Sequence, residues 1–419
     1  MLTHNNIAAS VASTKLSVAM SPEDVHISYL PMAHIYEMLI CFVGLACGGS
    51  AGFWRGDIVG LLEDIQELRP TLFIGVPRVF NRIYDKVLAG VGDSGKLKQM
   101  LFNYAMSSKR AALEAGATSS IWDKIVFKKI QDLMGGRVRM IVSGSAPLSA
   151  EVQHFLRVTT GATVKQGYGL TETSALLAVQ MECDPNSAGH VGPPAPTCEV
   201  KLVDVPEMGY LSVNEPQRGE IVVRGNNVFK GYYKAQDKTD EVLTRDGWFH
   251  TGDIGEWQAN GVLKIIDRKK NIFKLAQGEY VAVEMIETIL TRAKYVMQIF
   301  IHGDSLKDYL VAIVVPDAET VIPWAKANGL PEDMATLAQH PRLKKLLYED
   351  MVATGTASKL NGFQLPRQFH IEPSPWTVEN GLLTPSMKAK RPTIKAAYSA
   401  QIDKLYTEPR LDGTPAAKL

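Results

Sequence analysis

A glycine-rich polar segment, "QGYGLTET" at residues 166–173, combines side chains that could together bind a nucleotide. A tyrosine ring can stack on a base, a threonine hydroxyl can donate to a phosphate oxygen, and a carboxylate can hold Mg²⁺ beside that phosphate. Glycines let a backbone approach a flat ring or a phosphate closely. Local chemistry alone leaves a second interpretation open, in which Thr171 and Glu172 only cap a helix.

A second polar loop, "GSAP" at residues 144–147, follows the buried run "VRMIVS" at residues 138–143. The first segment likewise follows a strand-like run, "TVKQ" at residues 163–166. Ligands of open parallel sheets bind outside the carboxyl ends of the strands. If the two runs are such strands, both loops are placed to contribute to a nucleotide site.

The chain around these loops alternates between strand and helix patterns. The expected strands lie at residues 25–30, 71–77, 138–143 and 163–166. The expected helices lie at residues 37–46, 57–68, 96–115 and 121–134, with one more after the loop at residues 144–147. This alternation predicts an α/β fold, with a parallel sheet and helices on both of its faces.

The pattern changes after about residue 187. Short strands, "EVKLVD", "GEIVVRG" and "GVLKIID", are separated by turn residues, and Asn260-Gly261 is a hairpin signal. This predicts a small antiparallel β-barrel or sandwich, of which the barrel is preferred, followed by a smaller α+β C-terminal domain. The expected domains are the α/β part of a large domain at residues 1–187, the barrel at 188–268, a mobile α+β domain at 269–406 and a flexible tail at 407–419.

Composition narrows the function classes. The chain has 419 residues, 46% of them hydrophobic, which is enough for two or three domains with substantial cores. A net charge of +1 gives no global electrostatic case for a nucleic-acid partner or an acidic surface, and the four cysteines lack metal-ligand spacing. The uncharged run at residues 38–54 could be taken for a membrane span, but a buried helix that leads into a strand is favoured.

Four motifs together resemble a known superfamily. "QGYGLTET" resembles the signature loop of the adenylate-forming acyl-CoA synthetases, luciferases and peptide synthetases, and "SGSAPL" (residues 143–148) resembles their adenine loop. "GWFHTGDIGEW" resembles the ribose-binding aspartate segment, and "DRKKNIFKLAQGEYV" resembles the hinge. "LPMAHIYE", "VPRVFNRIYDKV" and "NGLLTPSMKAKRP" resemble the long-chain fatty-acyl-CoA synthetase branch.

The resemblance implies a long-chain-fatty-acid–CoA ligase that forms AMP. Such enzymes join a fatty acid to ATP as an acyl-adenylate, with release of pyrophosphate, and coenzyme A then displaces AMP; Mg²⁺ accompanies the nucleotide. One alternative is a catalytically inactive fragment that binds acyl groups or AMP. Another is an adenylating enzyme with a different acid or acceptor. The sequence of residues 30–82 argues against it, because it resembles the long-chain branch.

The resemblance also implies roles for single residues. Those that would bind the nucleotide are Gly144, Ser145, Ala146, Gly167, Tyr168, Gly169, Asp253 and Arg268. Tyr168 would stack near adenine, and Asp253 would accept from both ribose hydroxyls with Arg268 assisting. Thr171 would touch phosphate, and Glu172 would bind Mg²⁺.

Three further positions match functional positions of the superfamily. Lys388 in "TPSMKAKR" matches the catalytic lysine of adenylation, but Met387 stands where members outside this branch have glycine, so Lys390 remains an alternative. Lys270 matches the hinge residue. His34 in "PMAHIYE" matches a position near the acyl and phosphate groups, or is a structural histidine.

The first and last residues of the sequence lead to two further predictions, on activity and on localisation. In relatives a Ser/Thr/Gly-rich phosphate loop with a lysine precedes a segment like "MLTHNN", with which this sequence begins. We therefore expect an N-terminally truncated chain with impaired ATP-dependent adenylation. The final Ala417-Lys418-Leu419 is close to the Ser-Lys-Leu signal, which predicts peroxisomal localisation through the import receptor. The alternatives are the cytoplasm and peripheral contact with the endoplasmic reticulum membrane.

Overall fold

The computed structural model describes all residues except 58–59, 118–120, 182–183, 185–186 and 414–419. The chain forms two compact units. The first unit comprises Met1–Thr251 and Gly255–Ile265, and the second comprises Gly252–Ile254 and Ile266–Leu419. The domain boundaries expected from the sequence, at residues 187, 268 and 406, stay predictions.

The first unit contains a six-stranded sheet. Its strand order is β2 (Ser50–Phe53), β1 (Val25–Ser28), β3 (Leu72–Gly75), β4 (Met140–Ser143), β5 (Thr163–Tyr168) and β6 (Ala178–Val179). The first five strands are parallel, and β6 pairs with β5 in the antiparallel sense. The predicted parallel sheet is therefore confirmed, and β4 and β5 are neighbours within it.

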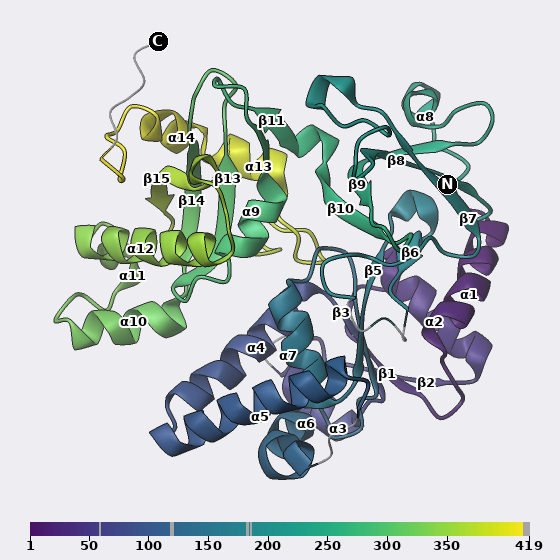
Figure 1. Ribbon diagram of the computed structural model, residues 1–419, viewed down its shortest axis with the longest axis horizontal. Coiled ribbons are helices and arrows are strands. Elements are labelled where there is room, and N and C mark those ends of the chain that lie inside the picture. Colours follow the sequence, from purple (N-terminus) through teal and green to yellow (C-terminus); the bar gives the residue numbers. More distant parts are fainter. Residues whose placement is uncertain (58–59, 118–120, 182–183, 185–186, 414–419) are drawn as a thin grey trace. The chain divides into compact units, whose positions relative to one another are not determined.

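Helices cover both faces of this sheet (Figure 1). One face carries α1 (His4–Val18) and α2 (Ile35–Cys47). The other carries α3 (Leu61–Leu68), α4 (Pro77–Gly92), α5 (Lys96–Glu114), α6 (Lys128–Leu133) and α7 (Ala150–Thr160). On the first face, Val18 and Ile40 pack with Ile74 and Val142 in one buried cluster.

The uncharged run at residues 38–54 forms most of α2 and then β2, as the favoured interpretation predicted. No helix in the described part of the chain is long and apolar enough to cross a membrane. Residues 121–134, expected to form one helix, are helical as far as Leu133, and Asp123–Phe127 within this helix is a π-helical stretch that continues into α6. The helix expected at residues 57–68 begins only at Leu61, and residues 58–59 lie outside the described residues.

A second, antiparallel sheet has the order β10 (Leu263–Arg268), β9 (Phe249–Trp257), β8 (Arg218–Gly225) and β7 (Cys198–Val203), with α8 (Gln236–Val242) between β8 and β9 in sequence. The expected turn joins β9 to β10: Gln258 N–H donates to Val262 O at 3.0 Å, and Gly261 has a φ of 77°. That this sheet closes into a barrel stays a prediction.

The second unit is α+β, as predicted. A hairpin, β11 (Ile272–Lys274) and β12 (Tyr280–Ala282), leads into α9 (Val283–Leu290). A three-stranded sheet follows, in the order β13 (Val296–His302), β14 (Leu310–Pro316) and β15 (Pro366–Ile371). Its helices are α10 (Ala318–Ala327), α11 (Met334–Leu337), α12 (Pro341–Ala357), α13 (Arg391–Ala397) and α14 (Ser399–Leu405). Alternate residues of β14 enter two different hydrophobic clusters, because successive strand residues face opposite ways.

Candidate functional site

The adenine loop (residues 143–148) leaves the carboxyl end of β4 and is shaped by an aromatic ring. Tyr36 of α2 donates its hydroxyl hydrogen to Val142 O at 3.1 Å. A Cβ on Gly144 would lie 2.9 Å from a carbon of the Tyr36 ring, so only glycine lets the ring pack there. Ser145 has a φ of 71°, an uncommon conformation for a residue with a side chain, and Ala146 is exposed.

A buried network of three glutamines joins the adenine loop to the signature loop (residues 166–173). Gln166 Oε1 accepts from Leu148 N–H at 2.9 Å, and Gln166 Nε2 donates to Gln153 Oε1 at 2.7 Å. Gln180 Oε1 accepts from Gln153 Nε2 and from the Gln166 backbone N–H, both at 2.7 Å. The two loops are thereby fixed to each other through side chains in the core.

The signature loop begins at the end of β5 with Gly167, Tyr168 and Gly169. A Cβ on Gly169 would lie 1.8 Å from Ala175 O, so the loop can close on itself only with glycine at this position. At Gly167 the nearest atom to such a Cβ is 3.9 Å away, so packing does not require glycine there. Tyr168 is half-buried, packed at the edge of a hydrophobic cluster.

Glu172 is held by two contacts from a distant part of the first unit. Its backbone carbonyl accepts from Phe229 N–H at 2.8 Å, and its Oε1 accepts from the Tyr232 hydroxyl at 2.8 Å. Burial, and then the hydrogen bond to Glu172, raise the pKa of Tyr232 to about 12, so this hydroxyl stays a donor at neutral pH. Thr171, next to Glu172, is exposed.

This geometry fits one half of a metal–nucleotide site. Mg²⁺ in such sites is commonly bound by one or two protein carboxylates together with phosphate oxygens. Glu172 offers a carboxylate with a fixed orientation on a loop outside the sheet. Within the described residues there is no group of three or more His, Cys, Asp or Glu side chains that could hold a metal ion.

His34 has a structural contact in the first unit. It is the N-cap of α2, and its Nδ1 accepts from Tyr36 N–H at 3.2 Å. An N-cap acceptor satisfies one of the free backbone donors at the start of a helix. His34 therefore helps to place Tyr36, against which the adenine loop packs.

Asp253 and Arg268 are brought together in the second unit. Asp253 lies on β9 and is 4% exposed, whereas Arg268 ends β10 and is exposed. Arg268 Nε lies 3.4 Å from Asp253 Oδ1. The neighbouring strands thus pair a buried carboxylate with a guanidinium, and the ribose-binding role of the two residues stays a prediction.

Lys388 also lies in the second unit, where the charges of Arg268 and Asp253 act on its ammonium group. Its backbone N–H donates to Thr384 Oγ1 at 3.0 Å, within a tight turn. Burial lowers the pKa of Lys388, and the charge of Arg268 lowers it further, while Glu284 and Asp253 act in the opposite direction. Lys390 is instead the N-cap residue of α13.

Met387, the residue before Lys388, has an uncommon backbone conformation. Its φ of 61° lies in the left-handed region that glycine adopts without steric cost. Its side chain packs against a buried cluster of the second unit. The hinge candidate, Lys270, is exposed in a short 3-10 turn, Lys269–Asn271, just after the chain enters the second unit at Ile266.

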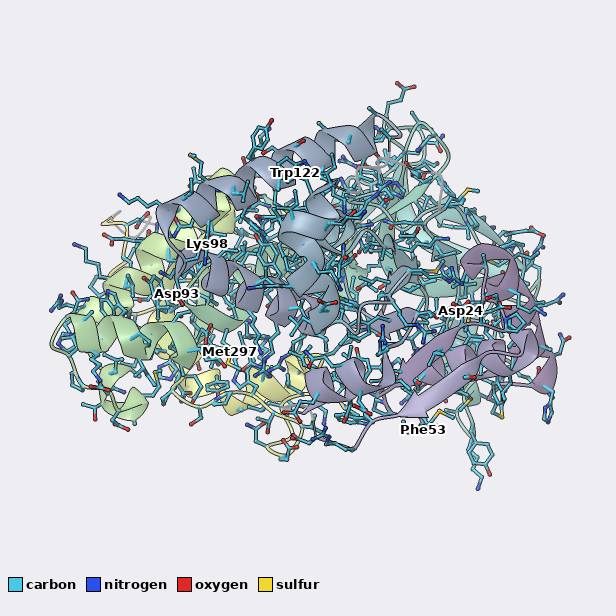
Figure 2. All side chains as sticks on the ribbon, turned by 90° about the horizontal axis from the view of Figure 1, so that it is seen from below. Asp24, Phe53, Asp93, Lys98, Trp122 and Met297 are labelled. Carbon is cyan, nitrogen blue, oxygen red and sulfur yellow. The ribbon has the colours of Figure 1, made fainter. Side chains whose placement is uncertain are left out.

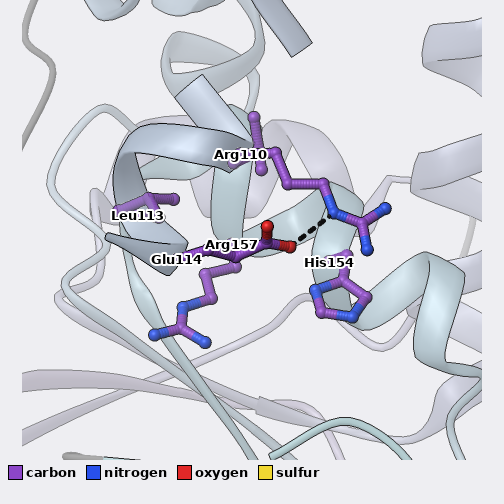
Figure 3. Close-up of a pocket in the computed structure, with 6 residues that line it drawn as sticks. Arg110, Leu113, Glu114, His154 and Arg157 are labelled. Carbon is purple, nitrogen blue, oxygen red and sulfur yellow. Dashed lines mark hydrogen bonds and ion pairs between the residues drawn. The ribbon is translucent and has the colours of Figure 1, made fainter. Parts of the chain in front are cut away.

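A separate small pocket lies between α5 and α7 (Figure 3). Arg110, Glu114, His154 and Arg157 line it, and Arg110 Nε donates to Glu114 Oε1 at 2.9 Å. Burial, followed by the charges of Arg110 and Arg157, lowers the pKa of His154. None of the site residues expected from the sequence lines this pocket.

Sequence reasoning missed the residues that support the site, above all Tyr36, Gln153, Gln180 and Tyr232. Each acts through a contact between positions far apart in the chain; Glu172 and Tyr232, for instance, are 60 positions apart. The one local signal was Gln166, which directly precedes the glycines of the signature loop.

Comparisons with known proteins agree with this architecture. The family described as "AMP-binding enzyme" matches residues 1–233. The chain is 50% identical over 411 residues to "Long chain acyl-CoA synthetase 7, peroxisomal" of Arabidopsis thaliana, covering 97% of this chain and 59% of the relative. It is 49% identical over 418 residues to "Fatty acyl-CoA synthetase A" of Dictyostelium discoideum, covering 98% and 62%. The chain thus spans about three fifths of the length of these relatives.

A solved structure is similar over nearly the whole chain. It is the A domain of carboxylic acid reductase from Segniliparus rugosus in complex with AMP and a co-purified carboxylic acid. The TM-score is 0.74 and the identity is 30%, with 96% of this chain and 58% of that chain covered.

Proposed function

Because the chain belongs to the family of AMP-binding enzymes, we propose that it takes part in the ATP-dependent activation of a long-chain fatty acid to its CoA thioester. The observation that carries the proposal is the pair of polar loops at the carboxyl ends of the adjacent parallel strands β4 and β5. The names of the two relatives, which are acyl-CoA synthetases, support the choice of acid and acceptor.

In the first half-reaction, a carboxylate oxygen of the fatty acid attacks the α-phosphorus of ATP, and pyrophosphate leaves. Gly144, Ser145 and Ala146 would line the adenine, and Tyr168 would stack near it, between Gly167 and Gly169. Asp253 would accept from the ribose hydroxyls, and Arg268 would hold that carboxylate in place, which the 3.4 Å contact supports.

Thr171 would donate to a phosphate oxygen, and Glu172 would bind Mg²⁺, which when bound neutralises phosphate charge. The Lys388 ammonium would stabilise the negative charge that develops between the carboxylate and the α-phosphate. In the second half-reaction the CoA thiol attacks the acyl carbonyl and AMP leaves. Lys270 would be the hinge residue for this step.

The experiment separates the two half-reactions with Lys388→Ala and the matched control Lys390→Ala. Lys388→Ala should lose fatty-acid-dependent adenylate formation, yet still convert supplied acyl-adenylate and CoA into thioester, whereas Lys390→Ala should retain both. Retained adenylation in Lys388→Ala, with loss in Lys390→Ala, would transfer the role to Lys390. If the unsubstituted chain binds neither AMP nor an acyl-adenylate mimic in a thermal-shift titration, the proposed function is wrong.

We also propose that the protein acts in the peroxisome, with peripheral contact to a membrane surface. The name of the Arabidopsis relative, a peroxisomal acyl-CoA synthetase, supports the compartment. Ala417-Lys418-Leu419 lies outside the described residues. A fluorescent protein fused to the last ten residues should enter peroxisomes through the import receptor, and diffuse fluorescence would contradict this route.

A further inference from the structure

An exposed apolar stripe runs along the first half of α5. Leu97, Met100, Leu101 and Tyr104 are spaced three and four positions apart, so they share one face of the helix. Their exposed fractions are 75%, 66%, 42% and 64%. Phe102 and Ala105, on another face, are buried and attach α5 to the first unit. The stripe is therefore not needed to hold α5 in the fold.

The segment that follows α5 extends this apolar surface. The ring of Trp122 lies edge-on to the ring of Tyr104, with 5.6 Å between centroids, and Trp122 Nε1 donates to Ser108 Oγ at 3.1 Å. Ile121 and Ile125, beside Trp122, are 64% and 65% exposed. We define the α5 patch by its exposed apolar residues: Leu97, Met100, Leu101, Tyr104, Ile121 and Ile125. Figure 2 labels Lys98 and Trp122 on the helices that carry the α5 patch.

Positive charge is concentrated in the same segment. Residues 96–132 contain seven Lys or Arg and three Asp or Glu, a net charge of +4, whereas the whole chain has a net charge of +1. Lys96, Lys98 and Lys124 are exposed next to patch residues in the sequence. The three acidic residues are already paired, Asp123 with Lys109, Glu114 with Arg110 and Asp132 with Lys128. The surroundings of the patch are therefore complementary to a negatively charged partner.

We propose that the α5 patch and its lysines dock the protein onto the surface of an anionic lipid bilayer. Exposed leucine, isoleucine and aromatic side chains flanked by lysines are the combination that inserts into the boundary between lipid headgroups and acyl chains. A second copy of the chain would bring an equal positive charge to the same surface, which opposes a symmetric dimer there. The inference deepens and rests on the proposed function, because long-chain fatty acids partition into bilayers.

The test is vesicle flotation of the 419-residue chain with phosphatidylcholine vesicles, with and without phosphatidylserine. We expect binding to the anionic vesicles that weakens as salt is added, because salt screens the attraction. Lys96→Glu/Lys98→Glu should reduce partitioning by at least about 30-fold, given the contribution of each lysine near an anionic surface. Leu97→Ser/Leu101→Ser should reduce it by at least about tenfold.

Matched controls change the same residue types elsewhere on the surface. Val213 and Leu306 are 82% and 73% exposed, and Lys238 and Lys359 are exposed lysines outside the patch. Val213→Ser/Leu306→Ser and Lys238→Glu/Lys359→Glu should keep vesicle binding within about twofold of the unsubstituted chain.

Four outcomes would overturn the proposal: no flotation of the unsubstituted chain, equal binding to neutral and anionic vesicles, equal losses in the controls, or patch variants that change a dimer into a monomer while vesicle binding persists. AMP binding by thermal shift is measured on every variant. Vesicle binding without AMP binding refutes the proposed function and leaves the docking surface supported. AMP binding without vesicle binding refutes the docking surface alone.

Discussion

Removing the Tyr232 hydroxyl tests whether the orientation of Glu172 matters for binding the metal–nucleotide complex. Tyr232→Phe deletes the 2.8 Å hydrogen bond to Glu172 Oε1 but keeps the ring, which packs edge-on to Phe229 with 4.9 Å between centroids. A hydrogen bond to a carboxylate is worth about 1.5–3 kcal/mol, and the half-exposed setting reduces this to about 1 kcal/mol. That corresponds to a roughly fivefold weaker affinity.

The assay compares MgATP with metal-free AMP by isothermal titration. We expect Tyr232→Phe to weaken MgATP binding about fivefold and to leave AMP binding unchanged, because only the metal depends on the carboxylate. Glu172→Gln should show the same selectivity with a larger effect. Tyr233→Phe is the matched control, since its side chain is 72% exposed and adjacent in the chain. Equal weakening of MgATP and AMP, or no change in either, would refute the reasoning.

Three other substitutions test the backbone and the charges around the site. Gly169→Ala puts a Cβ 1.8 Å from Ala175 O and should lower the unfolding temperature, whereas Gly167→Ala, with 3.9 Å of space, should not; equal shifts would contradict this. Met387→Gly should relieve the backbone strain and lose the packing of the side chain, two effects that oppose each other, while Met387→Val should cost about 1–2 kcal/mol of stability in urea unfolding, because a β-branched residue resists the observed φ of 61°. Burial and then the charge of Glu284 raise the pKa of Asp267 to about 7, so its stabilising contribution is present below pH ~4 and is lost as the pH rises to about 7. Asp267→Asn should remove up to about 4 kcal/mol of this pH-dependent loss of stability, measured by hydrogen exchange in the second unit. An unchanged pH profile of the variant would contradict this.

The sequence predicted the sheet well, because buried parallel strands appear as short apolar runs. The strands at β3, β4 and β5, and the turn at Asn260-Gly261, were found from such local signals. The first helix was missed for a physical reason. The buried residues of α1 include Asn6, Ser10 and Ser13, so the helix has no apolar periodicity to detect. Asn6 Nδ2 instead donates to Asn226 O and Val228 O, both at 2.8 Å, which only the folded chain reveals.

The residues of the candidate site also fall into two groups, those identifiable from the sequence and those that only the folded chain reveals. Glycines and charged residues in short motifs, such as Gly169, Glu172 and Asp253, were identifiable from the sequence because their types and order are local features. The groups that position them were not, since Tyr36 reaches Val142 across 106 positions and Tyr232 reaches Glu172 across 60. Such pairings depend on the topology of the sheet, which no single motif encodes.

The glutamine network between the two loops bears on the chemical ageing of the protein. Amides do not ionise, so the hydrogen bonds that Gln153, Gln166 and Gln180 make inside the core keep their direction from acidic to alkaline pH. Deamidation of any of them would exchange two donors for a buried negative charge and leave facing acceptors unmatched. One such event, chemically remote from any nucleotide, would release the adenine loop from the signature loop. Loss of nucleotide binding in stored protein should therefore follow the appearance of glutamate at these three positions.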